Sequence, residues 1–161
     1  MSVLENVQVA LPRQHGDGLL TLFLRPFLVH RQDAANARRA MAILVFIGLA
    51  ERALDLAEDL SYAEEKLLVV ARLIATEADV LLFDEPLSGL DAAAMHRIIG
   101  LLRRLAASGS AIRIIEHNLE AIRSSCDHLI YLEEGRALAQ GSADALMADA
   151  DLVRRKLLEL F

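Results

Sequence analysis

The chain has 161 residues, of which 55% are hydrophobic, and a formal net charge of −6 at pH 7. This length allows one domain with a hydrophobic core. The negative net charge argues against a protein that binds the phosphate backbone of nucleic acid, because the sequence has no basic stripe. The single cysteine, Cys126, excludes an internal disulfide and a cysteine metal cage, and it fits a reducing cytoplasm.

The first third of the chain has the spacing of helices rather than strands. Its apolar run from Ala40 to Ala50 is too short to span a bilayer and predicts a buried helix instead. The predicted elements are a short helix over Val3–Ala10, a loop with Pro12, Gly16 and Gly18, an apolar stretch Leu19–His30 kinked at Pro26, and a helix Asp33–Ile47 ended by Gly48.

Strands and helices alternate after Glu58, which is typical of an α/β layer with parallel pairing. The run Val80–Phe83, apolar and bounded by charge, predicts a strand buried on both faces, and the Glu134-Gly135 pair predicts a hairpin. The elements expected here are a helix Ser61–Ile74, the strand Val80–Phe83, a helix Asp91–Ala106, a strand Ala111–Ile115, a helix Asn118–Ser124 capped by Asn118, strands His128–Leu132 and Ala137–Gln140, a short helix capped by Ser142, and a charged helix Asp151–Leu160.

Two acids, Asp84 and Glu85, directly follow the strand Val80–Phe83. Ligands of α/β proteins bind at the carboxyl ends of the strands, where such an Asp can hold Mg²⁺ on nucleotide phosphates and a Glu can orient water. Acids at this position are also common as helix caps or turn formers. His117 follows the next strand, and taken alone it fits a turn histidine better than a ligand contact. Because each of these residues ends a buried apolar run, we expect Asp84, Glu85 and His117 to lie at neighbouring strand ends on one edge of the sheet.

Five segments together resemble the nucleotide-binding domains of ABC transporters in their order and spacing. They are Leu60–Lys66, Ala71-Arg72, Val80–Pro86, Ser88–Asp91 and Glu116–Asn118. The resemblance implies a P-loop NTPase fold of the ABC type. Residues 1–75 would form its helical subdomain and residues 76–161 the C-terminal half of its ATPase core. Within the family, the chain looks most like the branched-chain amino-acid importers in three features: the signature tyrosine Tyr62, the long apolar insert after the first helix, and the tail near Val153–Leu158.

The resemblance also implies a role for each matching residue. Asp84 would be the Walker B magnesium ligand, Glu85 the catalytic base and His117 the switch histidine at the γ-phosphate. Ser88, Gly89 and Asp91 would belong to the D-loop, which communicates across the dimer. The signature segment, which clamps ATP held by the other subunit, would be Leu60, Ser61, Tyr62, Ala63 and Glu64.

An ABC-type ATPase would use ATP and Mg²⁺ and would lie in the cytoplasm on the inner face of the membrane. Its partners would be membrane permease subunits and a second ATP-binding subunit, with no nucleic acid involved. The implied function is to energise import of a small solute, such as branched-chain amino acids. The alternative is a catalytically inactive remnant or regulatory module that binds a permease or a partner ATPase.

The sequence departs from the family pattern in two places. It contains no G-x-x-x-x-G-K-[ST], the phosphate-binding loop. We therefore expect a truncated or split domain that is inactive alone. In the signature segment, Ala63 replaces a glycine and Glu64 replaces a glutamine, which adds a methyl group and a negative charge where a phosphate would approach. Ser61 and Glu64 also have the spacing of an ordinary capping box.

Overall fold

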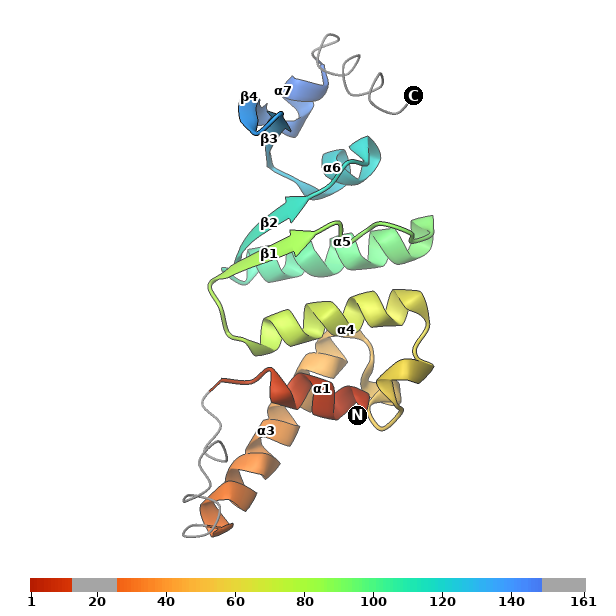
Figure 1. Ribbon diagram of the computed structural model, residues 1–161, viewed down its shortest axis with the longest axis vertical. Coiled ribbons are helices and arrows are strands. Elements are labelled where there is room, and N and C mark those ends of the chain that lie inside the picture. Colours follow the sequence, from red (N-terminus) through yellow and green to blue (C-terminus); the bar gives the residue numbers. More distant parts are fainter. Residues whose placement is uncertain (13–25, 149–161) are drawn as a thin grey trace. The chain divides into compact units, whose positions relative to one another are not determined.

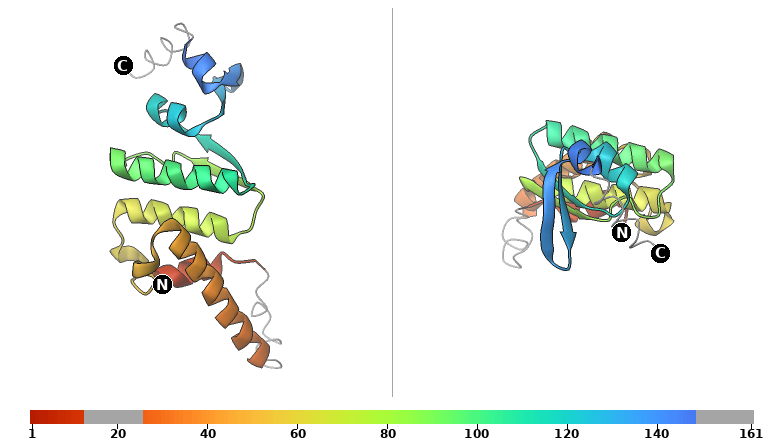
Figure 2. Two further views of the ribbon diagram at one scale, coloured as in Figure 1. Left: turned by 180° about the vertical axis from the view of Figure 1, so that it is seen from behind. Right: turned by 90° about the horizontal axis from the view of Figure 1, so that it is seen from above.

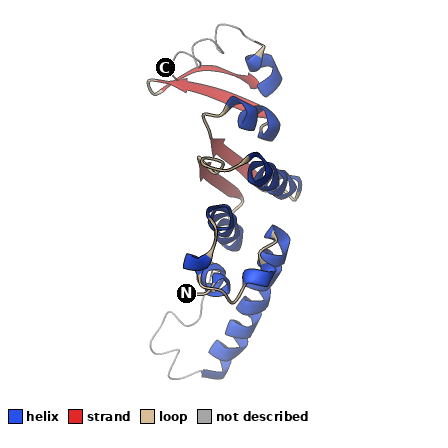
Figure 3. Cartoon of the chain, turned by 90° about the vertical axis from the view of Figure 1, so that its right-hand side faces the viewer, coloured by secondary structure: helices blue, strands red, loops and turns tan. Residues whose placement is uncertain are grey.

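The computed structural model describes residues 1–12 and 26–148 (Figure 1). The chain divides into two compact units. The first comprises Met1–Leu82 and Ala106–Arg113, and the second comprises Phe83–Leu105 and the chain from Ile114 onward. Helices dominate the first unit, whereas the second combines helices with strands, which Figure 3 distinguishes by colour. The α/β class expected from the sequence is confirmed.

Three helices of the first unit pack on one another: α1 (Val3–Val9), α3 (Pro26–Ile47) and α4 (Tyr62–Ala75) (Figure 1). Each contributes an apolar stripe at helical spacing to a common core. The buried side chains include Val3 and Val7 from α1, Ala40 and Leu44 from α3, and Leu67, Val70 and Ala71 from α4.

The helices α1 and α4 both begin with a capping box, in which a serine and a glutamate accept hydrogen bonds from each other's backbone N–H groups. At α1, Ser2 N donates to Glu5 Oε2 at 2.7 Å and Glu5 N donates to Ser2 Oγ at 3.1 Å. Ser61 and Glu64 form the second box at α4. The sequence spacing of Ser61 and Glu64 therefore has the local structure that it predicts.

Two 3₁₀ turns, η2 (Ala50–Arg52) and η3 (Ala57–Asp59), lead into α4. Backbone hydrogen bonds tie the segment between these turns to the start of the chain, from Leu4 N to Ala53 O and from Val3 N to Asp55 O, both at 2.9 Å. The segment that precedes α4 is consequently braced by α1, although few of its own residues are buried.

The helix expected over Asp33–Ile47 is longer than its sequence pattern indicates. α3 runs without interruption from Pro26, a residue that fits the first turn of a helix because it needs no hydrogen bond there. Gly48 ends the helix as predicted and has φ +78°. The apolar run Ala40–Ala50 is only partly buried, because Val45 is 62% exposed.

A β-α-β motif follows, made of β1 (Val80–Asp84), α5 (Ala92–Ala107) and β2 (Ala111–Ile115) (Figure 1). β1 and β2 are hydrogen-bonded neighbours. They run parallel: Ala111 N donates to Asp79 O at 2.8 Å where both strands begin, and Glu85 N donates to Ile115 O at 2.9 Å where both end. The two carboxyl ends therefore lie side by side.

The expectation that β1 is buried on both faces is wrong. Leu81 and Phe83 are 3% and 5% exposed, whereas Val80 and Leu82 on the other face are 57% and 65% exposed. A strand is buried on both faces only where other elements cover both, and within the described residues one face of β1 is uncovered.

An antiparallel hairpin lies near the end of the described chain and is formed by β3 (His128–Glu133) and β4 (Arg136–Ser142) (Figure 2). Its turn is Glu134-Gly135, as predicted, with φ of +46° and +75°. α6 (Leu119–Ser125) and α7 (Ala143–Met147) pack together, and α7 also contacts both strands. Ser142 caps α7 through its Oγ, which accepts from Ala145 N at 3.3 Å.

The helix predicted over Asp151–Leu160 and the loop with Gly16 and Gly18 lie outside the described residues, as does much of the stretch Leu19–His30. Among the helices that are described, none is long and apolar enough to cross a membrane.

Candidate functional site

Glu85 and His117 meet at the carboxyl ends of β1 and β2. His117 Nδ1 lies 3.3 Å from Glu85 Oε1, and both side chains are about half exposed, at 52% and 51%. Glu85 has φ +45°, a left-handed conformation in which the backbone turns sharply out of the strand. The adjacency expected for these two residues is therefore confirmed, and the exposed Asp84 stands beside them at the last position of β1.

The loop from Glu85 to Asp91 connects this strand end to α5. Within it, Ser88 N donates to Glu85 O at 3.3 Å and Leu90 N donates to Leu87 O at 3.4 Å, while Gly89 adopts φ +75°. Asp91 caps α5, since its Oδ1 accepts from Ala94 N at 2.8 Å. The predicted segment Ser88–Asp91 is thus an ordered turn that leads into a capped helix.

Glu116 is a polar partner of this loop that sequence reasoning did not single out. Its Oε1 accepts a hydrogen bond of 2.9 Å from Leu87 N, 29 residues away in the chain, in a partly buried position. The Glu116-His117 pair was visible in the sequence, but only the pairing of β1 with β2 shows what the glutamate contacts.

The signature segment Leu60–Glu64 forms the first turn of α4 and the residues before it. Glu64 Oε2 accepts from Ser61 N at 2.9 Å and from Ser61 Oγ at 2.7 Å, and Ser61 Oγ accepts from Glu64 N at 3.4 Å. Leu60 is buried, and Tyr62 is half exposed with Lys66 Nζ 5.4 Å from its ring centroid. The Ser61 hydroxyl is accordingly engaged in a closed capping box.

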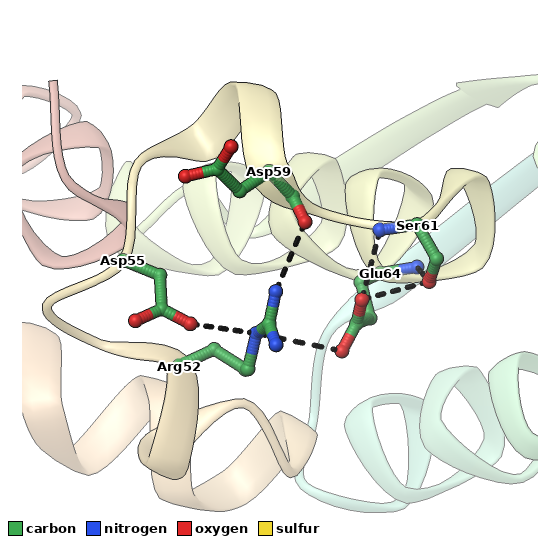
Figure 4. Close-up of polar contacts among 5 residues, drawn as sticks. All are labelled: Arg52, Asp55, Asp59, Ser61 and Glu64. Carbon is green, nitrogen blue, oxygen red and sulfur yellow. Dashed lines mark hydrogen bonds and ion pairs between the residues drawn. The ribbon is translucent and has the colours of Figure 1, made fainter.

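Arg52 contacts this capping box and the residues that precede it (Figure 4). Its Nη2 donates to Asp59 O at 2.9 Å, and its Nε lies 2.9 Å from Asp55 Oδ2 and 3.9 Å from Glu64 Oε1. The contact with Asp55 is an ion pair rather than an aligned hydrogen bond, because Arg52 Nε has no acceptor with suitable geometry. One guanidinium thereby links η2, η3 and the start of α4. No local pattern in the sequence indicates this role for Arg52.

The predicted site residues fall into two groups. Asp84, Glu85, His117 and the segment Ser88–Asp91 belong to the second unit, whereas Leu60–Glu64 belongs to the first. The structure brings Glu85 and His117 into contact and forms the capping box of Ser61 and Glu64.

The carboxylate of Asp84 at the end of β1 suits a magnesium ion whose other ligands are mostly phosphate oxygens. Within the described residues, no group of three or more His, Cys, Asp or Glu side chains is arranged to hold a metal ion. Mg²⁺ commonly uses one or two carboxylates and takes its other ligands from phosphates and water. A single exposed carboxylate such as that of Asp84 is compatible with this coordination.

Comparison with known proteins places these segments in one family. The chain is 34% identical over 138 residues to the L-cystine transport system ATP-binding protein TcyN of Escherichia coli. It is 29% identical over 160 residues to the high-affinity branched-chain amino acid transport ATP-binding protein LivG of Salmonella typhimurium. The chain belongs to the ABC-transporter ATP-binding proteins.

The matches cover most of this chain but only part of each relative. They include 84% of the chain and 55% of TcyN, and 99% of the chain and 63% of LivG. A solved ATP-binding cassette of an ABC transporter, MJ1267, superposes with a TM-score of 0.77 at 27% identity, over 96% of this chain and 62% of that one. No protein-family model matches the chain. The P-loop NTPase fold of the ABC type is therefore confirmed for this segment.

Proposed function

We propose that this chain is part of an ATP-binding subunit that energises import of a small solute through an ABC transporter, with an amino acid as the solute. TcyN and LivG, which are named for cystine and branched-chain amino acid transport, support this class of solute. The partners would be membrane permease subunits and a second ATP-binding subunit, on the cytoplasmic face of the membrane.

The contact between Glu85 and His117 carries the proposal. Two polar side chains at the ends of adjacent parallel strands, 3.3 Å apart and open to solvent, form a site that a nucleotide phosphate and a water molecule could enter. In this assignment Asp84 would hold Mg²⁺, Glu85 would take a proton from water, and His117 would contact the terminal phosphate and keep Glu85 in place. Bound Mg²⁺ would neutralise charge on the phosphates.

The signature segment would serve nucleotide held by the second subunit. A helix N-terminus offers backbone N–H groups to an anion, and α4 begins at Tyr62 with Ser61 as its cap. We assign residues 1–75 to the helical subdomain and residues 76–161 to the C-terminal half of the ATPase core, with Ser88–Asp91 at the subunit interface.

The test is Glu85→Gln in a complex with a companion subunit that supplies the phosphate-binding loop. Loss of a general base costs about 10²- to 10⁴-fold in rate, so we expect kcat for ATP to fall by at least about 100-fold. Nucleotide affinity, measured by calorimetry, should change only a few-fold, because a base acts in the transition state.

The matched control is Glu134→Gln, which neutralises an exposed acid in the β3–β4 turn and should leave kcat unchanged. Equal loss of binding and turnover in Glu85→Gln would show that Glu85 has a structural role, and the catalytic assignment would be wrong.

A non-catalytic module that binds a permease or a partner ATPase is the second candidate. The closed capping box favours it, because the Ser61 hydroxyl already donates to Glu64 at 2.7 Å and a phosphate would have to displace that carboxylate. Absence of nucleotide binding in every pairing, together with retained binding to the permease, would support the module over the ATPase.

A further inference from the structure

The loop after β1 needs an anchor that its own backbone does not supply. Glu85 turns the chain out of the strand, and the hydrogen bonds within the loop use the N–H groups of Ser88 and Leu90. Leu87 is 2% exposed, so its N–H lies in a part of the loop that is shielded from water. A buried donor without an acceptor is costly, and the acceptor here is the Glu116 carboxylate at 2.9 Å.

Three consecutive residues, the last residue of β2 and the two that follow it, contact this loop. Ile115 O accepts from Glu85 N at 2.9 Å, Glu116 Oε1 accepts from Leu87 N at 2.9 Å, and His117 Nδ1 lies 3.3 Å from Glu85 Oε1. The first of these contacts extends the strand pairing by one step. The second is a hydrogen bond to a carboxylate, a kind of bond that is stronger than one between neutral groups.

We propose that Glu116 is a positioning residue that holds Glu85 beside His117 by accepting the Leu87 N–H. Glu116 acts on the loop two residues beyond Glu85, so it restrains the left-handed turn at Glu85 from the far side. His117 and Glu116 are chain neighbours, and a shift of the loop away from Glu116 would also separate Glu85 from His117. As a step in ATP hydrolysis this role rests on the function proposed above, whereas the geometry can be tested without nucleotide.

The first test measures amide hydrogen exchange in the full chain. Glu116→Ala removes the acceptor, and we expect the Leu87 amide to exchange about 10- to 100-fold faster. Glu116→Gln keeps an oxygen at the same reach and should stay close to the unsubstituted chain. Asp127→Ala, which removes an exposed acid elsewhere in the second unit, is the matched control and should not affect Leu87.

The second test detects the contact between Glu85 and His117 through the NMR chemical shifts of the His117 ring. In the unsubstituted chain, Glu85→Gln should shift the ring signals of His117, because the two side chains touch. In the Glu116→Ala background the same change should shift those signals much less, and in the Glu116→Gln background the full response should return. The exchange pattern of the β3–β4 hairpin checks that the second unit stays folded in each variant.

Leu87 exchange that does not change in Glu116→Ala, or a His117 response to Glu85→Gln that persists in that background, would overturn the inference. In the reconstituted complex, Glu116→Ala should lower kcat about 10- to 100-fold with KM nearly unchanged, and Glu116→Gln should restore it. An unchanged kcat would also overturn it. A complex that never hydrolyses ATP would reject the proposed ATPase function and leave the geometric result to the two NMR readouts.

Discussion

Two residues of the signature segment, Ala63 and Glu64, set its chemical character. Glu64 completes the capping box and faces Arg52, so part of its negative charge is offset within the chain. Ala63, at the second position of α4, carries a methyl group where the family has a glycine. Each difference bears on how closely a phosphate can approach this helix end.

We predict that Ala63→Gly raises ATPase activity in the reconstituted complex, because it removes the methyl group from the expected phosphate path. The same change should lower the free energy of unfolding by about 0.5–1 kcal/mol, since glycine is less favourable than alanine in a helix. Ala93→Gly, at the second position of α5, should show the stability loss without the gain in activity. Unchanged activity with an intact dimer would mean that the methyl group does not obstruct the phosphate.

Arg52 should matter for stability more than an ordinary surface arginine. Arg52→Ala removes the hydrogen bond to Asp59 O and the ion pair with Asp55, and we expect the free energy of unfolding to fall by about 1–2 kcal/mol. Because 38% of the Arg52 side chain is exposed to solvent, the ion pair contributes only a small part of this loss in the free energy of unfolding. Urea denaturation of the full chain measures the loss.

The control for Arg52 is Arg103→Ala, on an exposed position of α5, which should change the free energy of unfolding by no more than about 0.5 kcal/mol. If both substitutions have the same small effect, the Arg52 contacts add nothing to the stability of the segment before α4.

Among the elements, the β3–β4 hairpin depends most visibly on its turn. Glu134 and Gly135 both have positive φ, the pattern of a type I′ turn, which matches the twist of the two strands. A side chain at Gly135 would meet no atom within 4 Å, so the only cost of substitution there is conformational.

We predict that Gly135→Val lowers the free energy of unfolding by about 1–2 kcal/mol, because L residues with a β-carbon disfavour this backbone region. Gly135→Asn should cost less, since asparagine tolerates it. Gly100→Ala in α5, where a Cβ also meets nothing within 4 Å and φ is not positive, should instead stabilise the chain. Urea denaturation of the three variants checks the signs, and a neutral Gly135→Val would contradict the turn assignment.

At the level of the whole molecule, the charge and the uncovered strand face govern its behaviour in solution. The net charge of −6 gives no long-range attraction for a nucleotide, and the sequence has no phosphate-binding loop. Val80 and Leu82 on β1 and Ile115 on β2 are each more than half exposed, at 57%, 65% and 58%. Exposed apolar strand residues favour self-association.

We therefore predict that the isolated 161-residue chain binds MgATP no more tightly than about 1 mM, the upper end of ordinary KM values. Calorimetry on a monodisperse sample measures this, and saturable binding below about 1 mM would show that Asp84, Glu85 and His117 hold nucleotide unaided. Leu82→Lys should reduce self-association in sedimentation experiments. Leu54→Lys, at a position 83% exposed in the first unit, should have little effect.

Features that depend on neighbouring residues in the chain were predictable from the sequence. The capping box of Ser61 and Glu64 and the turn at Glu134-Gly135 arise from interactions within a few residues. The apolar run Val80–Phe83 was enough to predict where the strand β1 lies in the chain. The alternation of β1, α5 and β2 was enough to predict parallel strands, and so the meeting of Glu85 with His117 at one end of them.

Contacts between distant residues were decided only by the tertiary structure. The acceptor for Leu87 N lies 29 residues away in Glu116, and Arg52 reaches Asp59 and Glu64 only because two 3₁₀ turns fold back toward α4. The exposed face of β1 has the same origin. Its apolar residues specify a strand, but its burial depends on which other elements cover it, and a run of four residues carries no information about them.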